Sequence, residues 1–246
     1  MHNAEKEESV RPFKRFAALI ISNEDVYKIA TRRVLKKHGL KPADYPKRFS
    51  TLVDEIGREA YALYLSEEER SGERVLREFF RKSKTRGIFK KLDRFFLSIS
   101  QSRKTRAGKA FEEIIKALFR KCDYPFDEQR VINGKPDFLM PSEKHFRKNA
   151  PDCIIFTAKR TLRERWRQIA TEGLRGLGFF LATIDGGISS KQAREMLTHR
   201  IYMVVPQSLK QGISDYKKAA NIITFEDFFT DHLDAAMRRW RRAGVI

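Results

Sequence analysis

The chain has 246 residues, 41% of them hydrophobic, which is enough to bury a core as one large domain or as a core with a helical extension. This content excludes a disordered chain, and no apolar run approaches the ~20 residues of a membrane span. The formal charge of +19 favours a polyanionic partner, nucleic acid before an anionic membrane surface, although a merely soluble basic protein stays an alternative. Two cysteines and no signal sequence predict a reducing cytoplasm and no structural zinc.

The first hundred residues carry helix signals and predict a mostly helical, basic N-terminal region over residues 1–100. A helix begins at Ser22, with apolar residues on one face, and is closed by Gly39. Ser50 is predicted as the N-cap of the next helix. Ser66 and Glu69 have the spacing of a capping box and predict a third helix. A fourth helix follows the break predicted at residue 87.

From Gly108 the pattern changes to helices alternating with short apolar strands. An amphipathic helix carries Glu112, and strands at 126–132 and 136–140 flank Asn133-Gly134, a hairpin signal. A polar loop is predicted at 141–152. The remaining segments, in chain order, are a strand beginning at 153, a helix after it, a strand at 178–183, a helix capped by Ser189 or Ser190, strands at 201–205 and 221–224, and a helix at 225–242. The alternation predicts an α/β fold, a sheet with helices on both faces.

Two strand residues are candidates for catalysis. Asp137 follows a proline at the start of one strand, and Lys159 ends another. If these strands pair, side chains on one face lie about 5 Å apart, close enough for a carboxylate and an ammonium group to share a site. Asp152 also follows a proline, and is the alternative to Asp137, although the predicted loop places it before the strand of Lys159.

Two further acids lie on predicted helices, Glu112 before the hairpin and Glu172 after Lys159. Three carboxylates and a lysine at one strand edge suit Mg²⁺-dependent hydrolysis of a phosphodiester, because Mg²⁺ prefers oxygen ligands and a lysine can stabilise charge on the phosphoryl group. The alternative is that each acid is a surface salt-bridge partner.

Arg163, Glu164 and Arg165 follow Lys159 closely, at the predicted N-terminus of a helix. Arginine binds the O6 and N7 atoms of guanine, and glutamate accepts from N4 of cytosine, so the triplet suits consecutive G·C pairs in a major groove. The alternative is a solvated basic helix face, which is common in a chain with this charge.

Three motifs resemble the type II restriction endonucleases of the PD-(D/E)XK fold, in the group around EcoRII, PspGI and Ecl18kI that cuts at sites with CC and GG flanks. They are Q-S-R-K-T-R-A-G-K-A-F-E over 101–112, K-P-D-F-L-M-P-S over 135–142 and K-R-T-L-R-E-R-W-R-Q-I-A-T-E over 159–172. The resemblance runs from residue 101 to the C-terminus and implies a catalytic core over 101–246, with a mixed central β-sheet flanked by helices. Thr157 stands where the general pattern has an acid, and in this group that acid is displaced to the position of Glu172.

The resemblance also implies roles for these residues. Asp137 and Glu172 would bind Mg²⁺, Lys159 would be the catalytic lysine, and Glu112 an additional active-site acid. Base recognition would fall to Arg163, Glu164 and Arg165, with Gln101 as a further candidate. The implied partners are double-stranded DNA, a second copy of the chain as a homodimer, and a DNA methyltransferase in the same host. Cleavage would leave 5′-phosphate ends.

Two rival functions stay open on the sequence. A repair or junction nuclease of the same fold would cut by DNA structure and would not need the arginine–glutamate–arginine triplet. A DNA-binding protein without catalysis would use its acids only in salt bridges. Incubating a plasmid with Mg²⁺ separates the three: discrete bands indicate restriction, nicking indicates repair, and intact DNA indicates binding alone.

Overall fold

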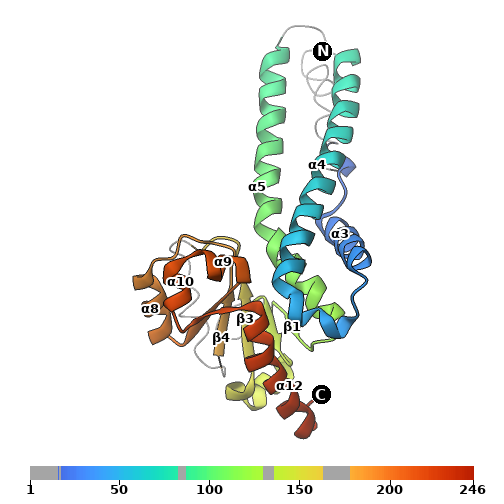
Figure 1. The fold of residues 1–246 in the computed structure, drawn as a ribbon. Coiled ribbons are helices and arrows are strands. Elements are labelled where there is room, and N and C mark those ends of the chain that lie inside the picture. The colour runs from blue at the N-terminus through green and yellow to red at the C-terminus, as the bar shows by residue number, and fades with distance from the viewer. Residues whose placement is uncertain (1–15, 17, 83–86, 130–135, 163–177) are drawn as a thin grey trace.

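A computed structural model describes residues 16, 18–82, 87–129, 136–162 and 178–246 (Figure 1). In these ranges, three helices from residue 23 onward precede a six-stranded sheet, and shorter helices and a C-terminal helical run complete the fold. The N-terminal helices are α3 (Asn23–His38), α4 (Phe49–Lys82) and α5 (Ile88–Lys121), with the 3₁₀ turns η1 (Pro42–Asp44) and η2 (Pro46–Arg48) between α3 and α4.

Helix α3 has the ends that the sequence predicts. The Ser22 hydroxyl accepts a hydrogen bond from the backbone N–H of Asp25, which satisfies one of the free donors of the first turn. Gly39 ends the helix in the left-handed conformation, at φ 58°, where a residue without a Cβ is favoured. The predicted helix from Ser22 to Gly39 is therefore confirmed.

Helix α4 is one uninterrupted helix of 34 residues, so the break predicted at Ser66 is wrong. The polar stretch that resembles a capping box lies inside the helix, where Glu68 binds Arg103 of α5. Ser50 is also not an N-cap, because α4 already begins at Phe49. Its backbone N–H and hydroxyl instead donate to the Glu226 carboxylate, at 2.8 and 2.6 Å.

Helix α5 also has 34 residues and passes without a break through residues 100 and 108. Its first half and the second half of α4 form a long antiparallel pair that extends away from the sheet (Figure 1). A small core joins them, which includes Val75 of α4 and Phe95 and Ile99 of α5. The division of the chain at residue 100 stays a prediction, and α5 belongs to both of its parts.

The sheet has the strand order β1-β2-β3-β4-β5-β6, so each strand pairs with its neighbours in sequence. The first three strands pair antiparallel and the last four parallel, which makes the sheet mixed. The strands are β1 (Asp127–Glu128), β2 (Phe138–Met140), β3 (Ile154–Ala158), β4 (Gly178–Ala182), β5 (Ile201–Val205) and β6 (Ile222–Thr224). The pairing of β1 with β2 confirms the predicted hairpin, whose turn lies outside the described residues.

Both faces of the sheet are buried, as a sheet with helices on each side requires. Alternate residues of β3 show the division: Ile154 and Phe156 pack with α3, α4, α5 and the C-terminal helices, whereas Ile155 packs with residues of α8 and α10. The helices on this second face are α8 (Ser190–Thr198), α9 (Gln207–Gly212) and α10 (Ser214–Lys218). The predicted α/β class, with helices on both faces, is confirmed.

Several shorter elements test the remaining predictions. Ser189 caps α8 in a capping box with Gln192, as one of the two serines was predicted to do. The predicted loop at 141–152 is partly wrong, because Ser142 caps the helix α6 (Glu143–Lys148) and the turn η3 (Ala150–Asp152) follows. The sequence signals also missed α9 and α10, which are only six and five residues long.

The predicted C-terminal helix is present as one helical run of three segments. These are α11 (Phe225–Asp227), the π-helix η4 (Phe228–Leu233) and α12 (Asp234–Arg242). Phe228 and Phe229 of the π-helix are fully buried against the sheet and the N-terminal helices. Among the residues that the structure describes, no helix is long and apolar enough to cross a membrane.

Candidate active site

Asp137 and Lys159 meet at the junction of β2 and β3, as the sequence predicts. The strands pair antiparallel with Phe138 opposite Phe156, which places Asp137 and Lys159 on the same face of the sheet. The Lys159 Nζ atom lies 3.0 Å from Oδ2 of Asp137 and 3.3 Å from Oδ1. A carboxylate and an ammonium group therefore share one site.

The backbone fixes the orientation of the Asp137 carboxylate. Its Oδ2 atom accepts a hydrogen bond of 2.8 Å from the backbone N–H of Ala158, the residue before Lys159. The Asp137 side chain is only 7% exposed, whereas that of Lys159 is 36% exposed. Burying a carboxylate is costly unless it is paired and hydrogen-bonded, and here it is both. The lysine remains open to a molecule that approaches from solvent.

The Glu112 carboxyl lies close enough to Asp137 and Lys159 for their charges to shift its pKa. It projects from α5, and its Oε1 atom accepts a hydrogen bond of 3.3 Å from the Gln129 side chain. Burial raises the pKa of the Glu112 carboxyl, and the negative charge of Asp137 raises it further, while Gln129 and Lys159 act in the opposite direction. Two carboxylates that repel each other in this way are typical of a site that a cation completes.

The pKa shift of Glu112 predicts how substitution affects stability. Because the pKa is raised in the folded state, the folded protein holds a proton over a pH range in which the unfolded chain has lost it. The stability that this proton contributes is present below the ordinary carboxyl pKa of 4.5 and is lost as the pH rises through the folded pKa. We therefore expect Glu112→Gln to stabilise the metal-free protein increasingly across this window. Thermal unfolding at stepped pH tests this, and a benefit that does not change with pH would contradict it.

The donor set at this site fits a divalent cation such as Mg²⁺. The Asp137 and Glu112 carboxylates are hard oxygen donors, the type that Mg²⁺ prefers, and Asp137 is already oriented by the backbone. Within the described ranges no group of three or more acids, histidines and cysteines surrounds a common point. A third carboxylate would have to come from elsewhere, and the predicted one, Glu172, lies outside the described residues.

Of the residues predicted to read DNA bases, the structure describes only Gln101. Arg163, Glu164 and Arg165 lie outside the described residues. Gln101 is an exposed residue of α5, eleven positions before Glu112. Eleven residues make about three turns of an α-helix, so Gln101 and Glu112 lie on the same side of α5, about 16 Å apart along its axis.

Asp152, the alternative to Asp137, has a structural role. Its carboxylate binds the His145 Nε2 atom at 3.0 Å and accepts from Nε of Arg239 at 2.9 Å, while its carbonyl accepts from the Trp240 indole. These contacts fasten the turn before β3 to α12. Neither Lys159 nor Asp137 is among its partners.

The structure adds two features that the sequence did not indicate. A cavity of about 480 Å³ lies between α3, α4 and α5, and four arginines line it: Arg58, Arg103, Arg106 and Arg160. Arg160 directly follows Lys159 in the chain, although Glu112, Asp137 and Lys159 do not themselves line this cavity. The other three come from distant parts of α4 and α5, where each resembles an ordinary surface arginine in the sequence.

The second feature is a set of hydrogen bonds, the clamp, that holds residues 160–162, directly after Lys159. The Asp185 carboxylate accepts from the backbone N–H of Leu162 and of Gly187, both at 2.9 Å. The Thr183 hydroxyl donates to the carbonyl of Arg160 at 3.3 Å. Asp185 and Thr183 thus fix residues 160–162, which connect the lysine to the predicted base-reading triplet.

Comparisons with known proteins bear on this site. Residues 67–229 match the model of the family described as EcoRII C terminal. The type II restriction enzyme SsoII of Shigella sonnei is 31% identical over 58% of this chain and 50% of its own length. The type II restriction enzyme EcoRII of Escherichia coli is 35% identical over 50% of this chain and 32% of its own length. The chain thus spans half of one relative and about a third of the other.

Solved structures agree with this result. Metal-depleted Ecl18kI in complex with uncleaved DNA has a TM-score of 0.75 at 25% identity, over 97% of this chain and 85% of that one. A complex of the restriction endonuclease PspGI with substrate DNA has a TM-score of 0.66 at 22% identity, over 89% and 94% of the two chains, and shows the fold alone. The fold is thus that of restriction endonucleases. The family match covers well over half of the residues, and the chain belongs to the EcoRII C-terminal family.

Proposed function

We propose that this protein is a type II restriction endonuclease that hydrolyses a phosphodiester bond in double-stranded DNA at a specific site. The observation that carries the proposal is the pair of Asp137 and Lys159 on adjacent strands, in a chain of the EcoRII C-terminal family. A buried, oriented carboxylate that can hold a divalent cation, beside a half-exposed lysine, is an arrangement that can bind and polarise a phosphate group.

Each residue of the site has a role in this proposal. Asp137 and Glu172 hold Mg²⁺, with Glu112 as an additional acid beside them. A bound Mg²⁺ supplies positive charge that stabilises the phosphoryl group as negative charge builds on it. Lys159 donates from the open side of the site, where its ammonium group can orient the attacking water and offset charge on a phosphate oxygen.

Binding of DNA has a separate basis. The charge of +19 and the four arginines of the cavity between α3, α4 and α5 support contacts with the phosphate backbone. Arg163, Glu164 and Arg165, with Gln101, would read G·C pairs in the CC and GG flanks of a palindromic site. A palindrome requires two-fold symmetry, so the active species is a homodimer, in a cytoplasm that also contains a cognate methyltransferase.

Digestion of a plasmid tests the activity. We expect discrete fragments with Mg²⁺ and intact DNA when a chelator replaces the metal. Sequencing of the fragment ends should return one palindrome with CC and GG flanks and 5′-phosphates. Random nicking would point instead to a structure-specific nuclease of the same fold, and binding without cleavage at any metal concentration would contradict the proposal.

Replacement of Arg163 tests the recognition role. Arg163→Ala should remove a bidentate contact with guanine and relax discrimination at one base pair by about 1–3 kcal/mol. The measurement is the ratio of cleavage rates for the cognate duplex and for duplexes with one substituted G·C pair. An unchanged ratio would remove Arg163 from the reading set.

Replacement of Asp185 tests the clamp on residues 160–162. Asp185→Ala removes both carboxylate hydrogen bonds, and we expect cleavage of the cognate duplex to fall about tenfold or more, because small displacements at an active site have large effects on rate. As a positioning residue, Asp185 should affect the cognate-to-mismatched ratio as well as the rate, and Asp185→Asn should recover part of both. Asp215→Ala is a matched control, since that acid accepts a hydrogen bond from Ser190 at the surface and, within the described ranges, from no other residue.

A further inference from the structure

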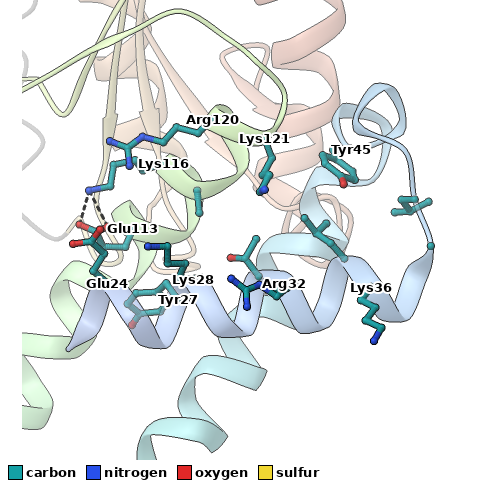
Figure 2. Close-up of a pocket in the computed structure, with 15 residues that line it drawn as sticks. Glu24, Tyr27, Lys28, Arg32, Lys36, Tyr45, Glu113, Lys116, Arg120 and Lys121 are labelled. Carbon is teal, nitrogen blue, oxygen red and sulfur yellow. Dashed lines mark hydrogen bonds and ion pairs between the residues drawn. The ribbon is translucent and has the colours of Figure 1, made fainter. Parts of the chain in front are cut away.

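A second basic pocket lies between α3 and the C-terminal half of α5, away from the candidate active site. Its volume is about 670 Å³, and η1 and Tyr45 lie at one end (Figure 2). None of Glu112, Asp137 and Lys159 lines it. Six basic and two acidic residues do: Lys28, Arg32, Lys36, Lys116, Arg120 and Lys121, with Glu24 and Glu113.

The basic residues fall into two groups. Lys116 binds Glu113 at 2.8 Å and Glu128 at 3.4 Å, and Arg120 also pairs with Glu128. Figure 2 shows Glu24 and Glu113 together at this end of the pocket. By contrast, Lys28, Arg32, Lys36 and Lys121 form no ion pair with any residue that the structure describes. In Figure 2, Lys28 lies beside these two glutamates, whereas Arg32, Lys121 and Lys36 lie toward the middle and the other end.

Three of the four basic residues that form no ion pair with a described residue lie on one face of α3. Lys28, Arg32 and Lys36 recur every four residues and so share one helix face. On the neighbouring face, Arg33 binds Glu59 at 2.9 Å and Lys37 binds Glu55 at 3.5 Å. Glu24 stands four residues before Lys28 on this face, but Arg32 and Lys36 have no acid at that spacing. Like charges at four-residue spacing destabilise a helix slightly, so these cations carry a small cost unless an anion joins them.

Thr31 provides an independent observation at the same pocket. It lines the cavity and is only 3% exposed, and its hydroxyl is the sole buried side-chain nitrogen or oxygen, within the described part of the chain, that has no hydrogen-bond partner. A buried hydroxyl without a partner costs about 1–3 kcal/mol. A ligand oxygen in the pocket would supply the missing acceptor.

The rest of the lining limits the size and chemistry of the ligand. Tyr27 and Tyr45 are buried, and Leu35 and Leu40 give the pocket an apolar side. Burial raises the pKa of Tyr27 to about 12, so its phenol stays neutral at physiological pH. A small anion with several acceptor oxygens matches the cations and the hydroxyl better than a metal ion or a purely apolar ligand.

We propose that the pocket between α3 and α5 binds a phosphate group through Lys28, Arg32, Lys121 and the Thr31 hydroxyl. Figure 2 shows Lys121 extending from α5 toward α3, and Lys28 extending from α3 toward α5. The phosphate could come from the backbone of bound DNA outside the cleaved bond or from a free phosphate ester. Both sources present the same oxygens, and the site is separate from the one proposed to cut DNA.

The first experiment uses inorganic phosphate on the full chain, with thermal unfolding and phosphorus NMR at matched ionic strength. We expect Lys28→Gln with Arg32→Gln to weaken phosphate binding at least roughly tenfold. The matched control is Lys217→Gln with Lys218→Gln, which removes the same charge from α10 and should leave binding unchanged. Without phosphate, Thr31→Val should unfold at a temperature equal to or higher than that of the natural chain. Added phosphate should raise the unfolding temperature of Thr31→Val less than that of the natural chain.

The second experiment identifies the source, with a short duplex that lacks CC and GG. If backbone phosphate occupies the pocket, the Lys28 and Arg32 double variant should bind the duplex more weakly than the Lys217 and Lys218 control, with a salt slope reduced by about 1–2. If duplex affinity is equal in the two variants, a free phosphate ester is the ligand. The proposal would be overturned if all variants bound phosphate equally, or if the natural chain bound none. Neither phosphate binding nor duplex binding depends on cleavage.

Discussion

Asp137→Asn is expected to abolish most cleavage while DNA binding persists. Asparagine keeps an oxygen that can accept from the N–H of Ala158, so the strand pairing should survive. It removes the negative charge that pairs with Lys159 and that, in our proposal, holds the metal ion. We expect the single-turnover cleavage rate to fall roughly 10²–10³-fold or more, with duplex affinity equal or higher, because a repulsive charge near phosphate is lost.

The chain contains a matched control for this substitution. Asp152→Asn changes the other proline-preceded aspartate, which binds His145 and Arg239 and fastens a turn to α12. This variant should unfold at a lower temperature but cleave at the rate of the natural chain once folded. If Asp152→Asn lost cleavage and Asp137→Asn kept it, the assignment of the active site would be reversed.

Phe119→Ala is expected to have the largest effect on stability. Phe119 is fully buried in α5. Its ring lies within 6.4 Å, centroid to centroid, of six other rings: Phe49, Tyr124, Phe126, Phe138, Phe156 and Phe229. Truncation removes these contacts and leaves a cavity, so the free energy of unfolding should fall by about 3–5 kcal/mol. Urea unfolding at equilibrium measures this.

Phe89→Ala provides the comparison. Phe89 lies on the same helix but is 85% exposed, so its truncation should change the free energy of unfolding by no more than about 0.5 kcal/mol. Because Phe119 contacts Phe138 and Phe156, it also supports the two strands that carry Asp137 and precede Lys159. A loss for Phe119→Ala no larger than for Phe89→Ala would mean that the site does not depend on this aromatic cluster.

Local signals were sufficient for part of this fold. The caps of α3 and α8 use side chains within three residues of the helix end, and the pairing of Asp137 with Lys159 follows from strand alternation. The same kind of signal failed at Ser66, because the stretch belongs to a helix that packs along α5, with Glu68 reaching Arg103. A capping pattern describes what a helix end needs, whereas tertiary contacts decide whether the helix ends there.

Other parts of the site could not be found from local patterns. The arginines of the cavity between α3, α4 and α5 come from α4, α5 and the segment after β3, and their convergence depends on helix packing. Asp185 acts on Leu162 across 23 positions of the chain, without a recognisable motif. The roles of Glu172 and of the triplet at 163–165 stay predictions, since those residues lie outside the described ranges.

The strand order of the sheet has a consequence for how the protein is made. Because each strand pairs with the one before it in sequence, a chain emerging from the ribosome can add every new strand to an edge that already exists. The strands of Asp137 and Lys159 join early in that order. The bond between Ser50 and Glu226 spans 176 positions and cannot close until residue 226 has left the ribosome. Until then, the strands beside Asp137 and Lys159 would be paired while the start of α4 is not yet fastened to the C-terminal helical run.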